Sequence, residues 1–461
     1  MNNKKHAIVI GGSISGMISA AILSKYFEKV TIMEKDPITN LTHTRKSTPQ
    51  AIHPHILLAR GTRILADIFP DFIDDLIKAG AVCANISRDS EHFVEENWQP
   101  RFTSDLICYF CSRSLLESVI RNQILKNDKI IFEVDTTVLE LVFDNKTKKV
   151  NGVKIKKLPQ NNLVNVSMLQ GDLVVDAGGR NSKTIEWLCD MGFEKPEETY
   201  VNSHIGYASR YYRIQKQFDN KTRLTIVLNR PPDFPKMGGI ISVENDKWLV
   251  GLYSIGKDLP PTKEDEFLDF AKNLANPKVY DLIRNAEPLS QIYGYRIKGN
   301  RLIHYEKLTS WPENFIVVGD AVCTFNPFYG QGMTVAALGG QVLDACMEKY
   351  YSTKKDFGHL FQKKLSKTNS RPWLLATGED FRWPTTTGKK PNLFVRLIQK
   401  YADSVLTITP YSKKATKSFQ EMMHMTKTPL ILFHPLIFVL VMRKFLSRNM
   451  INSNHKSSNS I

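Results

Sequence analysis

Residues 6–34 constrain the fold of this chain more than any other stretch. An apolar run at 7–10 predicts a strand that is buried on both faces, and the turn Gly-Gly-Ser-Ile-Ser-Gly at 11–16 follows it directly. Apolar residues then recur at helical spacing, and a second apolar run at 30–33 ends at Glu34. This order of strand, glycine-rich turn, helix and strand, with an acidic residue at the end, is typical of a dinucleotide-binding unit.

The residue types in the turn suit a bound pyrophosphate. Gly11 permits the tight turn, and Gly16 lets the helix pack close to the first strand. The start of the helix offers unpaired N–H groups and a partial positive charge. Glu34 can accept hydrogen bonds from ribose hydroxyls and would repel a 2′-phosphate, which favours FAD or NAD over NADP. The predicted ligand contacts in the turn are Gly11, Ser13, Ile14, Ser15 and Gly16.

A second informative stretch lies at 314–337. An apolar run at 315–318 predicts a buried strand that ends at Gly319 and Asp320, and the sequence Gly-Gln-Gly-Met at 330–333 opens a long helix. A carboxylate at the carboxyl end of a parallel strand points into the ligand crevice, and the glycines let backbone N–H groups approach a ligand. A helix N-cap is the alternative role for Asp320, although a loop rather than a helix follows it.

The remaining patterns predict an α/β framework with an inserted sheet. Residues 130–157 alternate like a strand pair joined at 144–145, and 172–177 predicts another buried strand. Aromatic and β-branched runs separated by turn residues fill 204–256, which predicts an antiparallel sheet that forms a wall for a substrate. Ser112, ahead of an apolar stripe, predicts the capped start of a helix.

Length and cysteine usage limit the class of protein. The chain has 461 residues, of which 42% are hydrophobic, so it can form two or three domains. We expect no signal peptide, because the first strand begins within ten residues, and six cysteines in so long a chain do not predict a disulfide framework. A reducing, cytoplasmic location is therefore expected. Cys108 and Cys111 have the spacing of a redox or metal pair but lie in an apolar, strand-like run, so we interpret them as structural thiols and expect no metal site.

The net charge of +16 is large, but the basic residues are spread along the chain. No zinc finger or other nucleic-acid-binding module is recognisable, so no nucleic-acid partner is expected. We interpret the charge as a source of solubility that can also attract an anionic membrane surface.

With both motif groups identified, the chain resembles FAD monooxygenases of the para-hydroxybenzoate hydroxylase class. The residues that carry this resemblance are Gly11-x-Ser13-x-x-Gly16 and Glu34 together with Gly319-Asp320-Ala321, Asn326-Pro327 and Gly330-Gln331-Gly332-Met333. Within that class, the chain resembles the branch of squalene epoxidase-like polyene epoxidases of polyether biosynthesis. This second resemblance rests on Arg45-Lys46-x-x-Pro49-Gln50, His53-x-His55-x-Leu57-Leu58 and Ser112-Arg113. The resemblance spans roughly residues 5–380, and it specifies the flavin fold better than the substrate.

The resemblance implies an α/β fold with a discontinuous, Rossmann-like FAD-binding domain, an inserted antiparallel-sheet substrate domain and a helical C-terminal region. The three parts of the FAD-binding domain are predicted at 1–66, 101–182 and 301–370. The other predicted parts are a substrate-side insertion at 67–100, the substrate domain at 183–300, the helical region at 371–446 and a disordered tail at 447–461.

The resemblance also implies roles for matching positions. Glu34 would bind the adenosine ribose, and Arg45 and Arg113 would contact the phosphate side of FAD. Asp320 would bind the ribityl chain and the pyrophosphate region. The helix N-terminus near Gly332 would face the flavin ring and stabilise its reduced, anionic form. The implied contacts at this helix are Gly330, Gly332 and Met333.

Several of these positions have alternative interpretations. A charge on an exposed helix face is the alternative for Arg113, and structural roles are the alternative for His53 and His55. Ser13 replaces the usual middle glycine, so its Cβ crowds the approach of the pyrophosphate slightly. Residues 176–179 read Asp-Ala-Gly-Gly where related hydroxylases carry Asp-Gly and a downstream arginine that affects use of the nicotinamide donor. NADPH and NADH therefore both stay open as the donor.

The implied activity is that of an FAD-dependent monooxygenase, which inserts one oxygen atom from O2 into a lipophilic alkene or aromatic substrate through a flavin C4a-hydroperoxide. NADPH or NADH would reduce the flavin without a stored nicotinamide site. Oxygen transfer to an alkene needs a dry pocket but no protein nucleophile, so no catalytic residue is assigned. A flavin-dependent prenyl or isoprenoid double-bond reductase, a halogenase (without its Trp-x-Trp-x-Ile-Pro signature) and a non-catalytic flavin-binding protein stay open as alternatives.

An apolar stretch lies near the C-terminus, at 430–442. It spans 13 residues and contains His434-Pro435, so it is shorter than the about 20 residues that a transmembrane helix needs. Two interpretations stay open. The stretch is either buried against the catalytic domain or lies on a membrane face, where Arg443, Lys444 and Arg448 would meet anionic headgroups. The sequence does not predict an oligomeric state.

Overall fold

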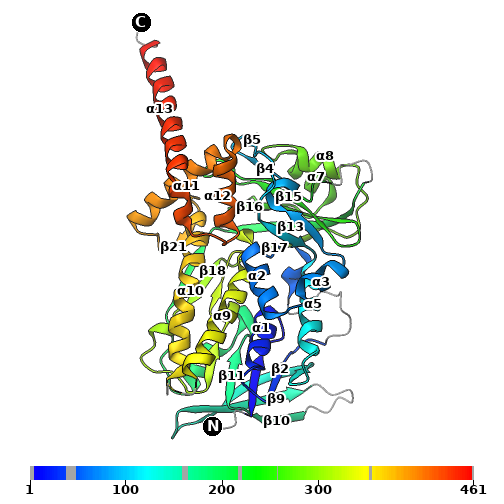
Figure 1. The fold of residues 1–461 in the computed structure, drawn as a ribbon, viewed down its shortest axis with the longest axis vertical. Helices are drawn as coiled ribbons and strands as arrows, with labels where there is room; N and C mark the ends of the chain where they lie inside the picture. Colours follow the sequence, from blue (N-terminus) through cyan, green and yellow to red (C-terminus); the bar gives the residue numbers. More distant parts are fainter. Residues whose placement is uncertain are drawn as a thin grey trace.

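The computed structural model describes residues 5–37, 48–157, 165–215, 221–256, 258–351, 353 and 356–458, with side chains up to Leu446 except that of Pro49. Arg45, a predicted phosphate contact, lies outside these residues. In Figure 1, the first strands and their helices fill the lower half of the molecule, and a second sheet and the C-terminal helices lie above them.

A five-stranded parallel sheet forms the framework of the lower half. Its order is β19-β11-β1-β2-β7, and every neighbouring pair is parallel. The strands are β1 (His6–Ile10), β2 (Lys29–Met33), β7 (Ile130–Glu133), β11 (Leu173–Asp176) and β19 (Phe315–Val317). The chain passes from β1 to β2 on one side, and β11 lies on the other. The crevice where such sheets bind ligands therefore adjoins the carboxyl end of β1.

Helices cover this sheet as its continuous apolar strands require. The helix α1 (Ile14–Leu23) follows β1 directly and packs against α5 (Arg113–Leu125) and α9 (Gly332–Tyr350). The helix α9 also packs against α2 (Ala59–Ile68) and the long α10 (Phe357–Asp380), as Figure 1 shows. Smaller helices in the first half are α3 (Phe72–Lys78), α4 (Ile86–Asp89) and α6 (Thr184–Asp190).

The predicted strand pair at 130–157 is confirmed for residues 136–157 and wrong for residues 130–133. Residues 130–133 form β7 at the edge of the parallel sheet, and the hairpin consists of β8 (Thr136–Asp144) and β9 (Lys149–Lys157). The strand β10 (Asn165–Gln170) completes a three-stranded antiparallel sheet with them. Alternation marked β7, β8 and β9 but did not show which sheet each one joins, and β10 was not predicted.

A seven-stranded sheet forms the predicted wall. The strands β13 (Ile205–Arg213), β14 (Leu224–Val227), β15 (Met237–Val243) and β16 (Lys247–Ile255) are antiparallel, as predicted. The order is β17-β13-β16-β15-β14-β4-β5, in which β4 pairs parallel with β14. The added strands are β17 (Tyr293–Arg296), β4 (Ser90–Val94) and β5 (Asn97–Trp98), and α7 (Glu264–Lys272) and α8 (Lys278–Ile283) pack against the sheet.

Two smaller sheets connect these parts. One pairs β3 (Val82–Asn85) with β6 (Ile107–Phe110). The other has the order β20-β18-β12-β21, with β20 (Cys323–Thr324), β18 (Asn300–Ile303), β12 (Glu198–Asn202) and β21 (Thr387–Gly388).

The C-terminal region is helical and consists of α11 (Leu393–Ile408), α12 (Lys413–Met423) and α13 (Pro435–Ser458). The helix α13 projects upward in Figure 1 and extends beyond residue 446, where we expected a disordered tail to begin. Gln420 on α12 joins this region to the body, because its side-chain oxygen accepts a hydrogen bond from Ser87 (2.6 Å). Within the described chain, no helix combines the length and apolar character needed to cross a bilayer.

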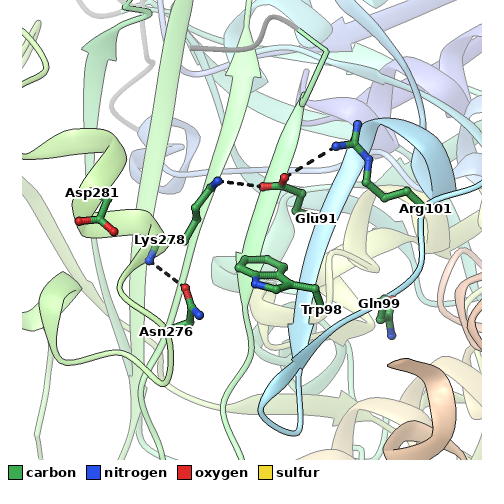
Figure 2. A pocket seen from close by; sticks show the side chains of 7 residues that line it. All are labelled: Glu91, Trp98, Gln99, Arg101, Asn276, Lys278 and Asp281. Carbon is green, nitrogen blue, oxygen red and sulfur yellow. Dashed lines mark hydrogen bonds and ion pairs between the residues drawn. The ribbon is translucent and has the colours of Figure 1, made fainter. Parts of the chain in front are cut away.

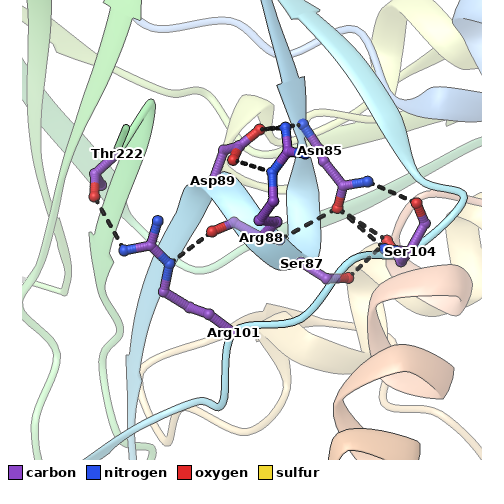
Figure 3. Close-up of polar contacts among 7 residues, drawn as sticks. All are labelled: Asn85, Ser87, Arg88, Asp89, Arg101, Ser104 and Thr222. Carbon is purple, nitrogen blue, oxygen red and sulfur yellow. Dashed lines mark hydrogen bonds and ion pairs between the residues drawn. The ribbon is translucent and has the colours of Figure 1, made fainter. Parts of the chain in front are cut away.

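Figure 3 shows the polar contacts that hold the α4 segment on which Ser87 lies. Asn85 caps α4 by accepting from the N–H of Arg88 (3.2 Å), and the hydroxyl oxygens of Ser87 and Ser104 lie 2.8 Å apart. Arg101 donates to the carbonyl oxygen of Arg88 (2.6 Å) and to the hydroxyl of Thr222 (3.3 Å). This network supports the surface on which α12 docks.

Candidate active site

The glycine-rich turn after β1 is as tight as its sequence predicts. Gly11 has a φ of +98°, which favours glycine, and its N–H donates to the carbonyl oxygen of Met33 (2.8 Å). A Cβ on Gly16 would lie 1.8 Å from the carbonyl oxygen of Gly11, so a side chain there cannot be accommodated. A Cβ on Gly12 would lie 2.4 Å from the ring of Phe132, which covers this side of the turn. The N-terminus of α1, with Ile14 as its first residue, is thereby held at the carboxyl end of the parallel sheet.

Arg113 joins the two motif groups. Its Nη2 donates to Ser13 Oγ (3.1 Å) and lies 3.3 Å from Glu117 Oε2, and its Nη1 lies 3.6 Å from Met333 Sδ. Ser112 caps the start of α5 with its side chain, as predicted, and so fixes the helix that carries Arg113. Because Arg113 is buried and bonded, the alternative of a charge on an exposed helix face was wrong.

Glu34 lies at the end of β2, beside the same turn. It is buried, and its carboxylate accepts hydrogen bonds from the N–H groups of Gly12 and Asp36, both at 2.9 Å. These two bonds direct the carboxylate toward the turn. The predicted ribose contact and the predicted pyrophosphate contacts are therefore neighbours in space.

Asp320 follows β19 at the carboxyl edge of the parallel sheet, where such folds have their ligand crevice, which we call the cleft. The residue is exposed to solvent, yet the surrounding protein disfavours its charged form and raises the pKa of the carboxyl. The positive charges of Arg180 and Arg113 act in the opposite direction and lower this pKa. Gly319, with a φ of +63°, is so close to Ser15 that a Cβ on it would lie 2.2 Å from the serine hydroxyl. The two motif groups therefore meet at this cleft.

Arg180 is a cleft residue that sequence reasoning missed. Burial lowers the pKa of its guanidinium, and the charge of Asp320 acts in the opposite direction. The turn before Arg180 is held by the buried carboxylate of Asp176, which accepts hydrogen bonds from the N–H of Gly178 (2.7 Å) and from the hydroxyl of Ser182. The Asp-Ala-Gly-Gly sequence thus forms a turn that presents an arginine to the cleft.

The start of α9 offers space and unused polar groups. Gly330 has a φ of +63° and ends the short helix η5 (Pro327–Tyr329), and α9 begins at Gly332. No described atom beyond the neighbouring chain lies within 4 Å of a Cβ placed on Gly332. Gln331 is buried, and its Oε1 has no hydrogen-bond partner among the described residues. A polar or anionic ligand at this helix N-terminus would meet free N–H groups.

Asp380, at the end of α10, positions the loop before α9. It is fully buried and accepts hydrogen bonds from Asn300 Nδ2 (2.5 Å), Asn326 Nδ2 (3.2 Å) and Tyr329 Oη (2.8 Å). Burial raises the pKa of Asp380 to about 6, and these donors act against that shift. We singled out Asn326 from the sequence, but a lone aspartate at a helix end gave no signal of this role.

His53 and His55 lie in the segment before α2, and their side chains have different partners. Nδ1 of His53 lies 2.9 Å from the Ser209 hydroxyl on β13, and its buried Nε2 has no partner within the described chain. Nδ1 of His55 donates to the carbonyl oxygen of His53 (2.8 Å). Burial lowers the pKa of His53 to about 3 and that of His55 to about 4, and the nearby charge of Arg113 lowers the latter further. Both imidazoles are therefore neutral at pH 7, and the segment lies between Arg113 and the seven-stranded sheet.

An aromatic cluster, which we call the aromatic wall, lines the sheet near His53. It comprises Tyr207, Tyr253 and Tyr295, with ring centroids of Tyr207 at 5.6 Å from Tyr253 and 5.5 Å from Tyr295. The ring of His53 meets Tyr207 edge-on at 4.4 Å. Tyr253 also contacts Phe328 (5.9 Å), which lies in the loop that leads to α9. The wall thus connects the sheet to the motif at 330–333.

A separate polar cavity of about 220 Å³ lies at the other edge of the same sheet (Figure 2). Its lining residues are Glu91, Trp98, Gln99, Arg101, Asn276, Lys278 and Asp281. The strands β16, β15 and β14 separate β4, which borders the cavity, from β13 of the aromatic wall, a distance of about 19 Å at the usual strand spacing. Glu91 is paired with Arg101 (3.7 Å) and Lys278 (3.9 Å), so the cavity is not part of the motif-lined cleft.

The two cysteines singled out from the sequence lie elsewhere. Cys108 and Cys111 are buried and not bonded to each other, and burial raises the pKa of Cys108 to about 12. Cys108 Sγ lies 3.5 Å from Nδ1 of His424 on the C-terminal side of α12. Cys108 therefore belongs to the packing between the body and the C-terminal region, and Cys111 belongs to the main hydrophobic core.

Comparison with solved structures identifies the fold. The chain aligns over 98% of its length with all of the flavin-dependent brominase Bmp2, at a TM-score of 0.67 and 14% identity. Over 94% of its length it aligns with 99% of p-nitrophenol 4-monooxygenase PnpA from Pseudomonas putida DLL-E4, at a TM-score of 0.61 and 15% identity. A third similar structure is 2-methyl-3-hydroxypyridine-5-carboxylic acid oxygenase. The alignment covers 93% of this chain and 99% of that one, at a TM-score of 0.58 and 16% identity. The chain has the fold of flavin-dependent monooxygenases and halogenases.

Sequence similarity adds a relative without a named activity. Protein Rv3254 of Mycobacterium tuberculosis (strain H37Rv) is 28% identical over 383 residues, which cover 81% of this chain and 80% of that protein. No protein-family model matches the chain. The predicted α/β fold class, with its parallel sheet, inserted sheet and helical C-terminal region, is confirmed.

Proposed function

We propose that the chain is an FAD-dependent monooxygenase that transfers one oxygen atom from O2 to a lipophilic alkene or aromatic substrate, as an epoxidase or hydroxylase. The observation that carries the proposal is the position of Arg113, which contacts both Ser13 and Met333. It brings the glycine-rich turn and the start of α9 to one cleft. A flavin dinucleotide is long enough to engage both motifs at once.

The residues at the cleft fit FAD. The turn at 11–16 suits the pyrophosphate, and Glu34 suits the adenosine ribose. Asp320 and Arg180 suit the ribityl chain and the adjoining phosphate, and Arg45 stays a predicted phosphate contact. The open space at Gly332 and the positive end of α9 suit the flavin ring.

FAD, when bound, supplies the redox chemistry with O2. The substrate gains one oxygen atom, the other leaves as water, and NADPH or NADH supplies the two electrons. The protein residues orient the substrate and exclude water. The apolar faces of the aromatic wall suit a flat or unsaturated hydrocarbon, and this supports a lipophilic substrate.

Neutral His55 is a polar group that we propose for the orientation of the substrate. Its Nδ1–H is bonded to the backbone, so its Nε2 is an acceptor, and the charge of Arg113 acts on this imidazole. A hydroxyl group on the substrate would therefore be oriented by His55. A substrate without a hydroxyl group would be held by the aromatic wall alone.

The test is an aerobic screen of the FAD-loaded protein against polyenes, prenylated quinols and phenols, with either nicotinamide as donor. We expect donor oxidation that the substrate stimulates, and a product heavier by one oxygen atom, labelled when 18O2 is used. A polyene that forms an epoxide would support the branch of squalene epoxidase-like enzymes.

Other outcomes would contradict the proposal in different ways. A product that gains two hydrogens without O2 would identify a double-bond reductase. A product that forms only with added bromide or chloride would identify a halogenase. Bound FAD without donor oxidation for any substrate would identify a non-catalytic flavin-binding protein.

A further inference from the structure

Large apolar side chains are exposed at an unusual density near the C-terminus. Twelve of the twenty-one exposed ones in the described chain lie within residues 393–446. We call the following group the apolar C-terminal face: Leu393, Phe394, Leu397, Leu430, Phe433, Leu436, Phe438, Val439, Met442, Phe445 and Leu446. Single exposed apolar residues are common on soluble proteins, but a concentration of this kind marks an interaction surface.

Aromatic contacts link the parts of this face on three elements. Phe394, Leu397 and Tyr401 lie on the same side of α11, because they are spaced by three and four residues. Tyr401 stacks on Phe433 at 4.4 Å and lies 6.4 Å from Phe438, ring centroid to ring centroid. The face therefore extends from α11 across the short helix η7 (Pro429–Phe433) to α13.

The helix α13 is apolar on the side that points away from the protein. Ile437 and Val441 are buried against α11 and α12, whereas Leu436, Val439 and Met442 are exposed. A helix at a protein–water boundary normally carries polar residues on its outer side. The outer side of α13 is therefore suited to an apolar environment and not to water.

Basic residues accompany the apolar face. Residues 389–446 contain ten lysines and arginines and only two acidic residues, so they supply half of the net charge of +16. Arg396 and Lys400 on α11 and Arg443 on α13 are exposed. Lys444, which we expected at a membrane surface, instead donates to the carbonyl oxygen of Thr407 (2.8 Å) and is part of the packing.

We propose that the apolar C-terminal face binds the surface of an anionic lipid bilayer. The exposed apolar side chains would enter the acyl boundary, and Arg396, Lys400 and Arg443 would lie at the headgroups. Charge favours this partner over a second copy of the chain, because a symmetric dimer would place two strongly basic regions against each other. A lipophilic substrate dissolved in the bilayer would then be close to the enzyme.

The test is co-sedimentation of the full-length protein with vesicles. Vesicles of phosphatidylcholine with phosphatidylglycerol should bind the protein, and vesicles of phosphatidylcholine alone should bind at least about tenfold less. Binding should weaken in 0.5 M NaCl, because salt screens the headgroup contacts. Equal binding to both vesicles, or none to either, would overturn the proposal.

Matched variants test the assigned face. Leu397→Asp with Leu436→Asp should reduce vesicle binding at least about tenfold. Leu125→Asp with Met168→Asp, which changes two exposed apolar residues elsewhere, should not change it. Arg396→Glu with Lys400→Glu should also weaken binding, whereas Lys78→Glu with Lys146→Glu should have less effect at the same change in net charge.

Two further measurements keep the test decisive. Circular dichroism and thermal unfolding check that each variant is folded. If the double variant of Leu397 and Leu436 does not fold, the single variant Phe394→Ser takes its place, because Phe394 is 70% exposed. Sedimentation without lipid measures the oligomeric state. A dimer that Leu397→Asp with Leu436→Asp abolishes would assign the face to a second copy and overturn the proposal.

Discussion

The cofactor cleft and the C-terminal helical region use opposite kinds of residue. In the cleft, charged side chains such as Arg113 and Asp380 are buried, and each is bonded to partners from distant segments. In the C-terminal region, apolar side chains such as Phe394 and Leu436 are exposed. The first arrangement prepares a polar site inside the protein, and the second leaves an apolar site on its surface.

This difference also separates two sources of stability. The cleft depends on a few close backbone contacts that leave no space for a side chain, such as the contact between Gly16 and Gly11. The C-terminal region has a small core of its own, in which Val405, Ile437 and Val441 are buried. Changes to the buried contacts of the cleft should therefore act on flavin binding and folding together, and changes on the apolar C-terminal face should act on neither.

The largest effect is expected for Gly16→Ala. The new Cβ would lie 1.8 Å from the carbonyl oxygen of Gly11, so α1 must move away from β1. We expect loss of bound FAD and a cost of more than about 3 kcal/mol in the free energy of unfolding, measured by flavin absorbance and urea denaturation. The matched control is Gly339→Ala on α9, where the nearest atom would lie at an ordinary 3.6 Å. Full flavin content in Gly16→Ala would contradict the role of this turn.

The sequence predicted the parts whose contacts are local. The unit from β1 through α1 to β2 follows from one short stretch, because a glycine turn and two apolar runs are recognisable without the rest of the chain. The capped start of α5 at Ser112 was predicted for the same reason. The strands β13 to β16 were predicted because their aromatic and β-branched runs are separated by turns.

The remaining features depend on contacts that no local pattern contains. Asp380 binds side chains from β18 and from the loop before α9, and none of them is near it in sequence. Residues 130–133 alternate like the hairpin that follows, so only the structure shows that they join the parallel sheet. The stretch at 430–442 is apolar except at His434, and its sequence did not separate buried Ile437 from exposed Leu436.

A smaller loss is expected for Asp380→Ala. Removing this buried carboxylate leaves the donors of Asn300, Asn326 and Tyr329 without their acceptor, and each unpaired buried group is costly. We expect a loss of about 3 kcal/mol in the free energy of unfolding, together with weaker FAD binding. Asp269→Ala, which removes an exposed carboxylate on α7, is the control and should change stability by less than about 0.5 kcal/mol. Similar urea midpoints for the two variants would contradict the positioning role.

Asp320→Ala should weaken FAD binding without unfolding the chain. Asp320 is exposed in the cleft, so its loss leaves no buried group unpaired. One lost charged hydrogen bond to the cofactor costs about 1.5–3 kcal/mol, or roughly 10- to 150-fold in affinity, which fluorescence titration of FAD measures. Asp281→Ala, at the polar cavity on the other edge of the sheet, should leave FAD affinity unchanged. If flavin release on dilution is the same in both variants, Asp320 does not contact the cofactor.

The smallest effect concerns His424, at the junction of the two regions. Its Nδ1 accepts a hydrogen bond from the N–H of Ala59 (3.3 Å), the first residue of α2. Burial, with a smaller contribution from the charge of His92, lowers the pKa of His424 to about 4. The folded state therefore favours the neutral imidazole. Its contribution to stability is complete above pH 6.5, the ordinary pKa, and is lost as the pH falls from 6.5 toward 4.

His424→Gln tests this linkage at the junction. At pH 5.5 the parent protein should have lost about 1.4 kcal/mol of stability through His424 relative to pH 8, and the variant should not show this part of the loss. Asp380 and Asp403, whose pKa is raised to about 6, act in the opposite direction, so the difference between variant and parent is the informative quantity. Urea denaturation at both pH values measures that difference. Equal losses of stability in parent and variant would mean that the pKa of His424 does not differ between the folded and unfolded states. Acid would then not weaken the attachment of the C-terminal region at this contact.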